Sequence, residues 1–351
     1  MIIISTIQKE NRMKTIFTKA DPESIALAAE LIKNGDIVAI PTETVYGIAA
    51  NACDGEAVKK IFIAKGRPQD NPLIVHICDK DMLYDVVSYV SDDAQKLADA
   101  FWPGPLTIIM PKGEKISSEN CAGLDSVGVR MPSDPVAHAI IKASGLPLGA
   151  PSANLSGKPS PTCAEDVFAD MDGRLPLIID GGESLRGVES TVISVLEDTP
   201  LLLRPGYITK EDIENVLGKR IEVSSAISEK LKEGETARSP GMKYKHYAPK
   251  AEITIIDSSF DKFVDYVREH NSLDTWCLCF TGEQDFLNLP CVSYGHEHDG
   301  AEQAHMLFSC LRELDKKGAK AAFARCPDKN GISLAVYNRL LRAAAFRVIK
   351  L

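Results

Sequence analysis

The sequence has no paired-cysteine motif and no long hydrophobic run. Its nine cysteines are scattered, and the closest two, Cys277 and Cys279, are separated by one leucine. An odd number of scattered cysteines, in a chain without a recognisable secretory signal, favours reduced thiols in a cytoplasm. No apolar run reaches the roughly 18 residues needed to cross a bilayer, so we expect no membrane contact. The opening MIIISTIQKENR lacks a basic segment before its apolar patch and a cleavage site after it, so we expect an N-terminal extension ahead of Met13 rather than a signal peptide.

Common phosphate-binding and metal-binding motifs are also missing. The pattern G-x-x-x-x-G-K-[ST] has no match, because the two Gly-Lys pairs lead into Pro159 and Arg220, and G-x-G-x-x-G is absent as well. Neither H-x-x-x-H nor a cysteine quartet is present, and HEH at 296–298 lies in a polar stretch that we interpret as a surface loop, so no metal-ligating residues are predicted. The net charge of −9 argues against a protein that coats nucleic acid nonspecifically, but it leaves room for a local basic pocket. A cytoplasmic enzyme or regulator is the class that remains.

Length and patterning predict two α/β domains. The 351 residues are many for one ordinary domain, and 44% hydrophobic and 25% charged residues are usual for a globular protein. In the first part of the chain several strands follow one another without a helix, which favours a twisted mixed sheet over a pure βαβ repeat. The strands are predicted at 36–40, 73–77, 106–110, 126–132, 175–180, 190–195 and 200–206, and the helices at 21–35, 54–64, 92–101, 134–144 and 209–217.

The second part is a connection followed by a smaller domain. Residues 219–250 are polar, rich in lysine and punctuated by Pro240-Gly241, and their length suits a lid as well as a linker. Beyond them, strands at 251–257, 275–280 and 319–324 alternate with helices at 300–318 and 331–349. We therefore expect a catalytic domain over 14–218, a linker or lid over 219–250 and a Rossmann-like α/β domain over 251–351.

Four polar stretches follow or end predicted strands of the first domain. They are PTETVYG (41–47), KGRPQDNPLIVH (65–76), VGVRMP (127–132) and GAPSANLSGKPSPT (149–162). Ligands of open α/β sheets gather at strand ends, where hydroxyls and backbone N–H groups hold phosphates. Each stretch also has an ordinary explanation: Arg130 could pair with a carboxylate, His76 could be a core histidine, and a Ser/Pro/Gly loop is most often only a loop. Together they bring three cations and a row of hydroxyls without a matching run of acids, which favours a polyanionic ligand.

An ordered set of motifs resembles a known family. PTETVYG, KGRPQDNPL, FWPGPLT, VGVRMP, APSANLSGKPSPT and ESTVI, followed by RPG (204–206) and SPGMKYKHYAP (239–249), resemble the threonylcarbamoyl-AMP synthases, which carry a YrdC-type domain, in their long two-domain form. The resemblance covers residues 14–250 by motif and the remainder by arrangement. It implies a YrdC-like catalytic domain and an enzyme that converts L-threonine, bicarbonate or CO₂ and ATP into L-threonylcarbamoyl-AMP and pyrophosphate.

The same resemblance implies a role for individual residues. Those expected around L-threonine are Thr44, His76, Arg130, Ala150 and Ser190. Those expected around ATP are Arg67, Asn71, Ser152, Ser160, Arg204 and Tyr247. Lys65 and Arg67 are expected to act in catalysis by neutralising the phosphates, together with a Mg²⁺ ion carried by ATP. The product would pass to a tRNA-modifying threonylcarbamoyl transferase complex, and a weak contact with tRNA is compatible with this place in the sequence of reactions.

Two other functions compete with this one. A basic concavity of this kind can serve as an RNA-binding module, but the motifs lack interleaved stacking aromatics. A related domain occurs in a carbamoyltransferase of hydrogenase maturation. That function would require zinc-finger cysteines and an acylphosphatase-like segment, and this sequence has neither.

Overall fold

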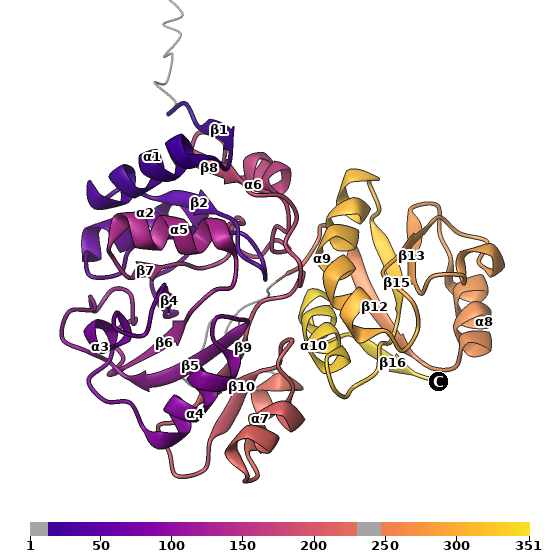
Figure 1. Cartoon of the computed structure of the whole chain (residues 1–351). Helices are drawn as coiled ribbons and strands as arrows, with labels where there is room; N and C mark the ends of the chain where they lie inside the picture. Colours follow the sequence, from indigo (N-terminus) through magenta and orange to yellow (C-terminus); the bar gives the residue numbers. More distant parts are fainter. Residues whose placement is uncertain (1–12, 230–246) are drawn as a thin grey trace, which may run out of the picture.

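The computed structural model describes residues 13–229 and 247–351. Over these residues the chain forms an 11-stranded mixed sheet, followed by a 5-stranded parallel sheet with its own helices (Figure 1). The expected fold class, a twisted mixed sheet plus a smaller Rossmann-like α/β domain, is confirmed. Within the described stretches no helix has the length and apolar character needed to cross a membrane.

The large sheet has the strand order β1-β8-β2-β3-β7-β4-β6-β5-β9-β10-β11. Its strands are β1 (Ile16–Lys19), β2 (Val38–Ile40), β3 (Gly47–Asn51), β4 (Ile74–His76), β5 (Leu106–Pro111), β6 (Ser126–Arg130), β7 (Leu148–Gly149), β8 (Leu177–Asp180), β9 (Thr191–Ser194), β10 (Leu201–Arg204) and β11 (Glu222–Val223). The pairs β4–β6 and β5–β9 are parallel, whereas β5–β6 and β9–β10 are antiparallel. As a result the last residues of β4, β6 and β10 and the residue before β9 lie at the same edge of the sheet.

Helix boundaries in this domain follow local capping signals. The helices are α1 (Pro22–Lys33), α2 (Gly55–Lys65), α3 (Leu83–Val86), α4 (Asp92–Phe101), α5 (Pro135–Ser144), α6 (Ala164–Met171) and α7 (Lys210–Leu217). At the start of α1 the Asp21 carboxylate accepts the Ser24 N–H at 2.7 Å and the Ser24 hydroxyl accepts the Asp21 N–H at 2.9 Å. This reciprocal box satisfies two backbone donors that the helix itself leaves unpaired. The helices predicted at 21–35, 54–64, 92–101, 134–144 and 209–217 are confirmed.

Several features of the first domain differ from the predicted pattern. Helix α3 and strands β1, β3 and β7 are not predicted from the sequence, and neither is α6, which forms without a side-chain cap at Cys163. The large sheet also continues beyond residue 218, because β11 pairs in parallel with β10 through Leu201–Glu222 and Leu202–Val223. The middle of the predicted lid, residues 230–246, lies outside the described residues.

The second domain contains β12 to β16 in the order β14-β13-β15-β12-β16, all parallel. Its elements are β12 (Glu252–Asp257), α8 (Phe260–His270), β13 (Thr275–Cys279), β14 (Cys291–Ser293), α9 (Gly300–Lys316), β15 (Ala321–Arg325), α10 (Ser333–Ala343) and β16 (Val348–Lys350). The single helix predicted over 331–349 is wrong at its end. Ala345 and Phe346 take positive φ values of 51° and 66°, so the chain turns after α10 and adds β16 to the sheet.

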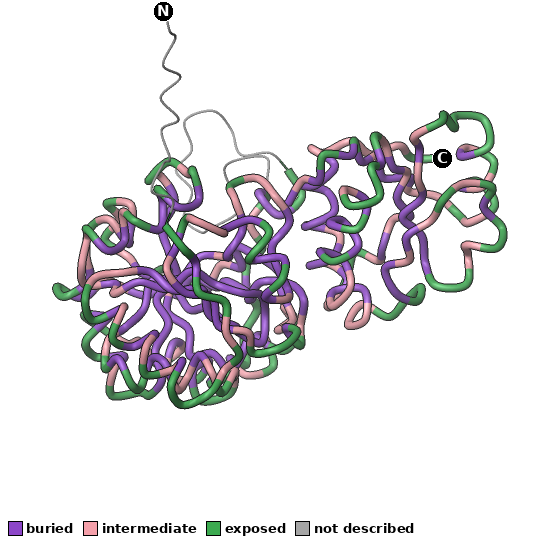
Figure 2. Tube along the Cα trace, turned by 90° about the horizontal axis from the view of Figure 1, so that it is seen from above, coloured by how far each residue is buried: buried purple, intermediate pink, exposed green. Residues whose placement is uncertain are grey.

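The two domains share a hydrophobic contact. Helices α9 and α10 lie on the side of the small sheet that faces the first domain, and α8 lies on the opposite side (Figure 1). The core of the second domain includes Val45 and Val188 from the first domain and Tyr247 from the connection. The Tyr247 and Phe308 rings lie 5.1 Å apart. Figure 2 shows buried chain running through the large sheet and on to this contact.

Candidate active site

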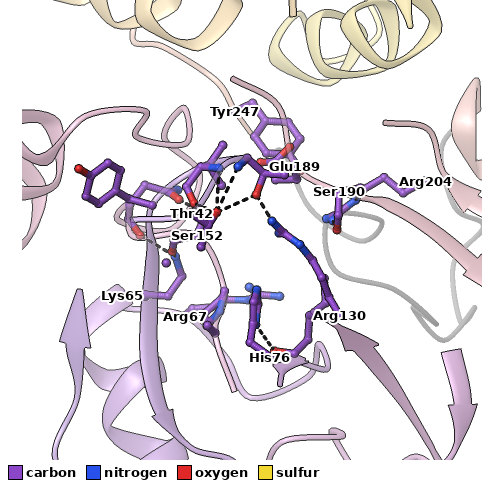
Figure 3. Close-up of a pocket in the computed structure, with 18 of the residues that line it drawn as sticks. Thr42, Lys65, Arg67, His76, Arg130, Ser152, Glu189, Ser190, Arg204 and Tyr247 are labelled. Carbon is purple, nitrogen blue, oxygen red and sulfur yellow. Dashed lines mark hydrogen bonds between the residues drawn. The ribbon is translucent and has the colours of Figure 1, made fainter. Parts of the chain in front are cut away.

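One pocket collects most of the polar motifs. Its empty volume is about 730 Å³, a value that includes space open to solvent. Of the twelve residues that the sequence assigned to a site, all but Asn71 and Ser160 line it: Thr44, Lys65, Arg67, His76, Arg130, Ala150, Ser152, Ser190, Arg204 and Tyr247 (Figure 3). Strand ends supply several of these residues, because His76, Arg130 and Arg204 are the last residues of β4, β6 and β10.

All three side-chain nitrogen atoms of Arg130 have a partner within the protein. Its Nη2 lies 2.6 Å from Glu43 Oε2, Nη1 donates to Thr44 Oγ1 at 2.8 Å, and Nε donates to the Gly104 carbonyl at 3.3 Å. Burial acts to raise the pKa of Glu43, but Arg130 outweighs it and the pKa ends below its ordinary value. A guanidinium has five N–H donors, so at most one on each terminal nitrogen remains for a ligand.

His76 is a neutral imidazole in this site. Burial, reinforced by the charge of Arg130, lowers its pKa to about 3. Its Nδ1 lies 3.2 Å from the Ile74 carbonyl oxygen, which fixes the plane of the ring. The ring is therefore a hydrogen-bonding surface beside Arg130 and not a further positive charge at neutral pH.

Lys65 is buried against the backbone of the loop that follows β7. Its ammonium donates to the carbonyls of Ser152 and Asn154, the second at 2.7 Å. Burial, followed by the nearby charge of Arg67, lowers the pKa of Lys65 well below its usual range. The loop is braced further by the Ser152 hydroxyl, which donates to Asn154 Oδ1 at 2.5 Å. Lys65 thus fixes the shape of the loop that carries several of the pocket hydroxyls.

The far wall of the pocket is a hydrogen-bonded pair of strand ends. Arg204 donates through Nε to the Ser190 carbonyl at 3.0 Å and through Nη2 to the Ser190 hydroxyl at 3.1 Å. The Ser190 and Thr107 hydroxyls lie 2.7 Å apart. Burial lowers the pKa of Arg204 to about 10, so the group stays charged at neutral pH. A fixed cation and a fixed hydroxyl therefore face the cavity together.

Two assigned residues, Ser160 and Asn71, do not line the pocket. Ser160 is fully buried, and its hydroxyl donates to Glu189 Oε1 at 2.6 Å, while Glu189 itself lines the cavity. Asn71 is also fully buried, and neither its amide nitrogen nor its amide oxygen has a hydrogen-bond partner among the described residues. A buried amide without a partner inside the protein is an exception among folded proteins, and a bound water or ligand is one explanation for it.

Sequence reasoning missed the carboxylates. Glu43 and Glu189 both fall within motifs, PTETVYG and ESTVI, but neither was given a role in the predicted site. The excess of positive charge survives nonetheless. Among the described lining residues, the cations are Lys65, Arg67, Arg130 and Arg204, and the only carboxylate is Glu189. No group of three or more His, Cys, Asp or Glu side chains within the described ranges could hold a metal ion.

Known proteins match the chain along most of its length. A family model described as "Telomere recombination" matches residues 30–206, and one described as "Threonylcarbamoyl-AMP synthase, C-terminal domain" matches residues 208–345. A threonylcarbamoyl-AMP synthase of Bacillus subtilis is 45% identical over 94% of this chain and 95% of its own. The chain belongs to the threonylcarbamoyl-AMP synthase family. A relative of the same name from Pyrococcus abyssi is 43% identical, over 93% of this chain and 95% of its own.

A solved structure agrees with this membership. The crystal structure of Sua5 from Pyrococcus abyssi complexed with L-threonine superposes with a TM-score of 0.88 at 41% identity, covering 97% of this chain and 99% of that one. The family, its two-domain form and the enzyme class predicted from the motifs are thereby confirmed. The comparisons favour neither the RNA-binding module nor the hydrogenase-maturation carbamoyltransferase.

Proposed function

We propose that this pocket joins L-threonine, bicarbonate or CO₂, and ATP to give L-threonylcarbamoyl-AMP and pyrophosphate. The observation that carries the proposal is one pocket in which four fixed cations and a row of hydroxyls face a single lining carboxylate. A ligand with several negative charges fits that balance. An amino acid and a nucleoside triphosphate supply such charges from two directions.

L-threonine is assigned to the end of the pocket near His76 and Arg130. The two N–H donors left on the terminal nitrogens of Arg130 suit the two oxygens of a carboxylate. Thr44 and Ser190 offer hydroxyls close by, and Ala150 offers a small apolar surface for the threonine methyl group. Because His76 is neutral, it binds by hydrogen bonding and adds no repulsion toward the ammonium group of threonine.

ATP is assigned to the side of the pocket lined by Arg67, Ser152, Arg204 and Tyr247. Ser160 contacts this pocket through Glu189, and the buried Asn71 amide, which has no partner among the described residues, would offer a donor and an acceptor to the nucleotide. Arg67 is placed to balance phosphate charge. Lys65, already bonded to two carbonyls, contributes positive potential and holds the loop of Ser152 in place.

The reaction mainly requires the site to position the reacting groups and to neutralise their negative charges. The threonine amine adds to CO₂, forming a C–N bond and releasing a proton, and a carbamate oxygen then attacks the α-phosphorus as pyrophosphate leaves. Two anions must approach each other, so fixed cations lower the barrier and correct alignment supplies much of the remainder. Both the carbamate and the mixed anhydride are labile in water, so a site that excludes solvent protects them.

Mg²⁺ enters this proposal as part of the MgATP substrate. Mg²⁺ keeps several waters and binds through substrate phosphates more readily than through an all-protein cage. The pocket fits that arrangement. Its lining carboxylate, Glu189, already accepts hydrogen bonds from Ser160 and Arg339, so the phosphates of ATP rather than a protein carboxylate would hold the ion. When bound, the ion would reduce charge repulsion at the triphosphate.

The product implies partners that consume it. A threonylcarbamoyl adenylate is an activated acyl donor, and the family role is modification of a tRNA adenosine beside the anticodon. Transfer by a separate threonylcarbamoyl transferase complex, a weak contact with tRNA and a cytoplasmic location all stay predictions.

The test is pyrophosphate release from ATP by the full chain, with and without threonine and with and without bicarbonate. We expect release only when both co-substrates are present, with L-threonylcarbamoyl-AMP identified by mass spectrometry. Pyrophosphate release at the same rate with and without threonine would indicate simple ATP hydrolysis to AMP and pyrophosphate and would overturn the proposal.

A further inference from the structure

We propose that Arg339 of the second domain is a positioning residue for the nucleotide side of the pocket, acting through Glu189 and Ser160. Arg339 lies on α10, in a different domain from the pocket, and its side chain is fully buried. This inference rests on the proposed function, because the affected side of the pocket is the one assigned to ATP.

Arg339 binds both segments that build the far wall of the pocket. Its Nε lies 2.9 Å from Glu189 Oε2, and its Nη2 donates to the Glu189 carbonyl at 3.3 Å. Its Nη1 donates to the Pro205 carbonyl at 2.8 Å. Glu189 directly precedes Ser190, and Pro205 directly follows Arg204. One guanidinium therefore fixes the spacing of the two segments that present Ser190 and Arg204 to the ligand.

The two carboxylate oxygens of Glu189 contact different domains. Oε2 meets Arg339 of the second domain, and Oε1 accepts the Ser160 hydroxyl of the first domain at 2.6 Å. Burial acts to raise the pKa of Glu189, but Arg339 and Arg204 overcome it and lower the pKa. The carboxylate therefore stays ionised and holds the Ser160 hydroxyl in one orientation.

Removing Arg339 would leave Glu189 buried with a different set of neighbours. Arg204 is the other cation that acts on it, so the carboxylate would turn toward Arg204 or take up a proton. Either change alters the hydrogen bond to Ser160 and the pairing of Arg204 with Ser190. The predicted cost falls on ATP binding, although Arg339 is not itself among the lining residues.

The experiment measures steady-state pyrophosphate release by the full chain at varied ATP and saturating threonine and bicarbonate. Arg339→Met keeps the side-chain length and removes the charge. We expect its KM for ATP to rise about tenfold, the effect of one lost charge-assisted hydrogen bond, with kcat near that of the wild type. Arg339→Lys keeps the charge but cannot reach the two carbonyls together, so an intermediate KM is expected.

Two control variants separate positioning from general loss of stability. Lys316→Met removes another ion pair between the domains, with Asp166 at 2.9 Å, and neither of those residues lines the pocket. Arg325→Met removes a buried arginine that pairs with Glu283 and Glu297 inside the second domain. We expect both to keep the wild-type KM for ATP, and Arg325→Met to lower the melting temperature.

Further variants test the route through Glu189. Ser160→Ala leaves the second domain intact and should raise the KM for ATP by a similar factor, even if Arg339→Met fails to fold. In the Arg339→Met/Glu189→Gln double variant the two effects should not add, because both break the same link. An unchanged KM for ATP in folded Arg339→Met, or in Ser160→Ala, overturns the inference while the wild-type activity stands. An inactive wild type would instead remove the proposed function.

Discussion

Glu43 and Arg130 form an ion pair of 2.6 Å that is almost completely buried, at the end of the pocket that we propose for threonine. The family motif predicts Arg130 as a threonine ligand, and a carboxylate partner is the alternative for a lone arginine at a strand end. The structure shows the carboxylate partner, while two guanidinium N–H donors remain for substrate. The pair therefore aligns the guanidinium before threonine arrives, which reduces the ordering needed on binding.

Glu43→Gln should destabilise the fold and weaken threonine binding. It leaves a buried arginine without its counter-charge, and breaking such a pair lowers the free energy of unfolding by about 3 kcal/mol. Urea unfolding measures that loss, and the KM for threonine should rise more than the KM for ATP. The Glu43→Gln/Arg130→Met double variant should recover part of the stability and stay inactive. Additive stability losses in the double variant would contradict a coupled pair.

Arg67→Ala should abolish most of the pyrophosphate release while the fold survives. Removing a fixed cation beside the reacting phosphates costs on the order of 10²-fold or more in rate. Arg268→Ala is the matched control, because Arg268 lies exposed on α8, away from this pocket, and its Nη1 is 3.7 Å from the Asp265 carboxylate at the surface. Circular dichroism of both variants should match the wild type. Undiminished release by Arg67→Ala would remove Arg67 from the nucleotide site.

Lys65→Met should impair both stability and ATP use. The carbonyls of Ser152 and Asn154 would lose their donor inside the protein, at a cost of about 2 kcal/mol in the free energy of unfolding. The loop that carries Ser152 would then relax, and the KM for ATP should rise. Lys60→Met, on the same helix but paired at the surface with Asp36, should change stability by less than about 1 kcal/mol. A stable Lys65→Met protein with a normal KM would show that the loop holds its shape without Lys65.

His76 should make the protein sensitive to acid in a specific pH range. Its pKa is about 3 in the folded protein against 6.5 for an ordinary histidine, so between these values the unfolded chain binds a proton that the folded chain does not. Stability therefore falls as the pH drops through that range, by up to about 1.4 kcal/mol per pH unit from this group. Urea unfolding at pH 7 and pH 5 measures the slope, and His76→Gln should flatten it. An equal slope in the variant would assign the sensitivity to groups other than His76.

The sequence by itself determined much of the local structure and the main body of the site. Caps such as Asp21 and turns after short apolar strands fix helix ends through contacts within a few residues, so they can be read from the order of residues. The motifs lie at strand ends, and that is why ten of the twelve assigned residues meet in one pocket. Helix α6 and strand β16 escaped prediction, because α6 has no side-chain cap and β16 depends on a left-handed turn at Ala345 and Phe346.

Only the tertiary structure decided how the charges pair. Arg130 meets Thr44 across 86 positions of sequence, and Arg339 meets Glu189 across 150. Spacing in a sequence carries no information on such contacts, since they depend on the strand order of one sheet and on the docking of one domain against another. Electrostatic energy depends on distance and burial, so the electrostatic potential of the pocket is a property of the folded chain.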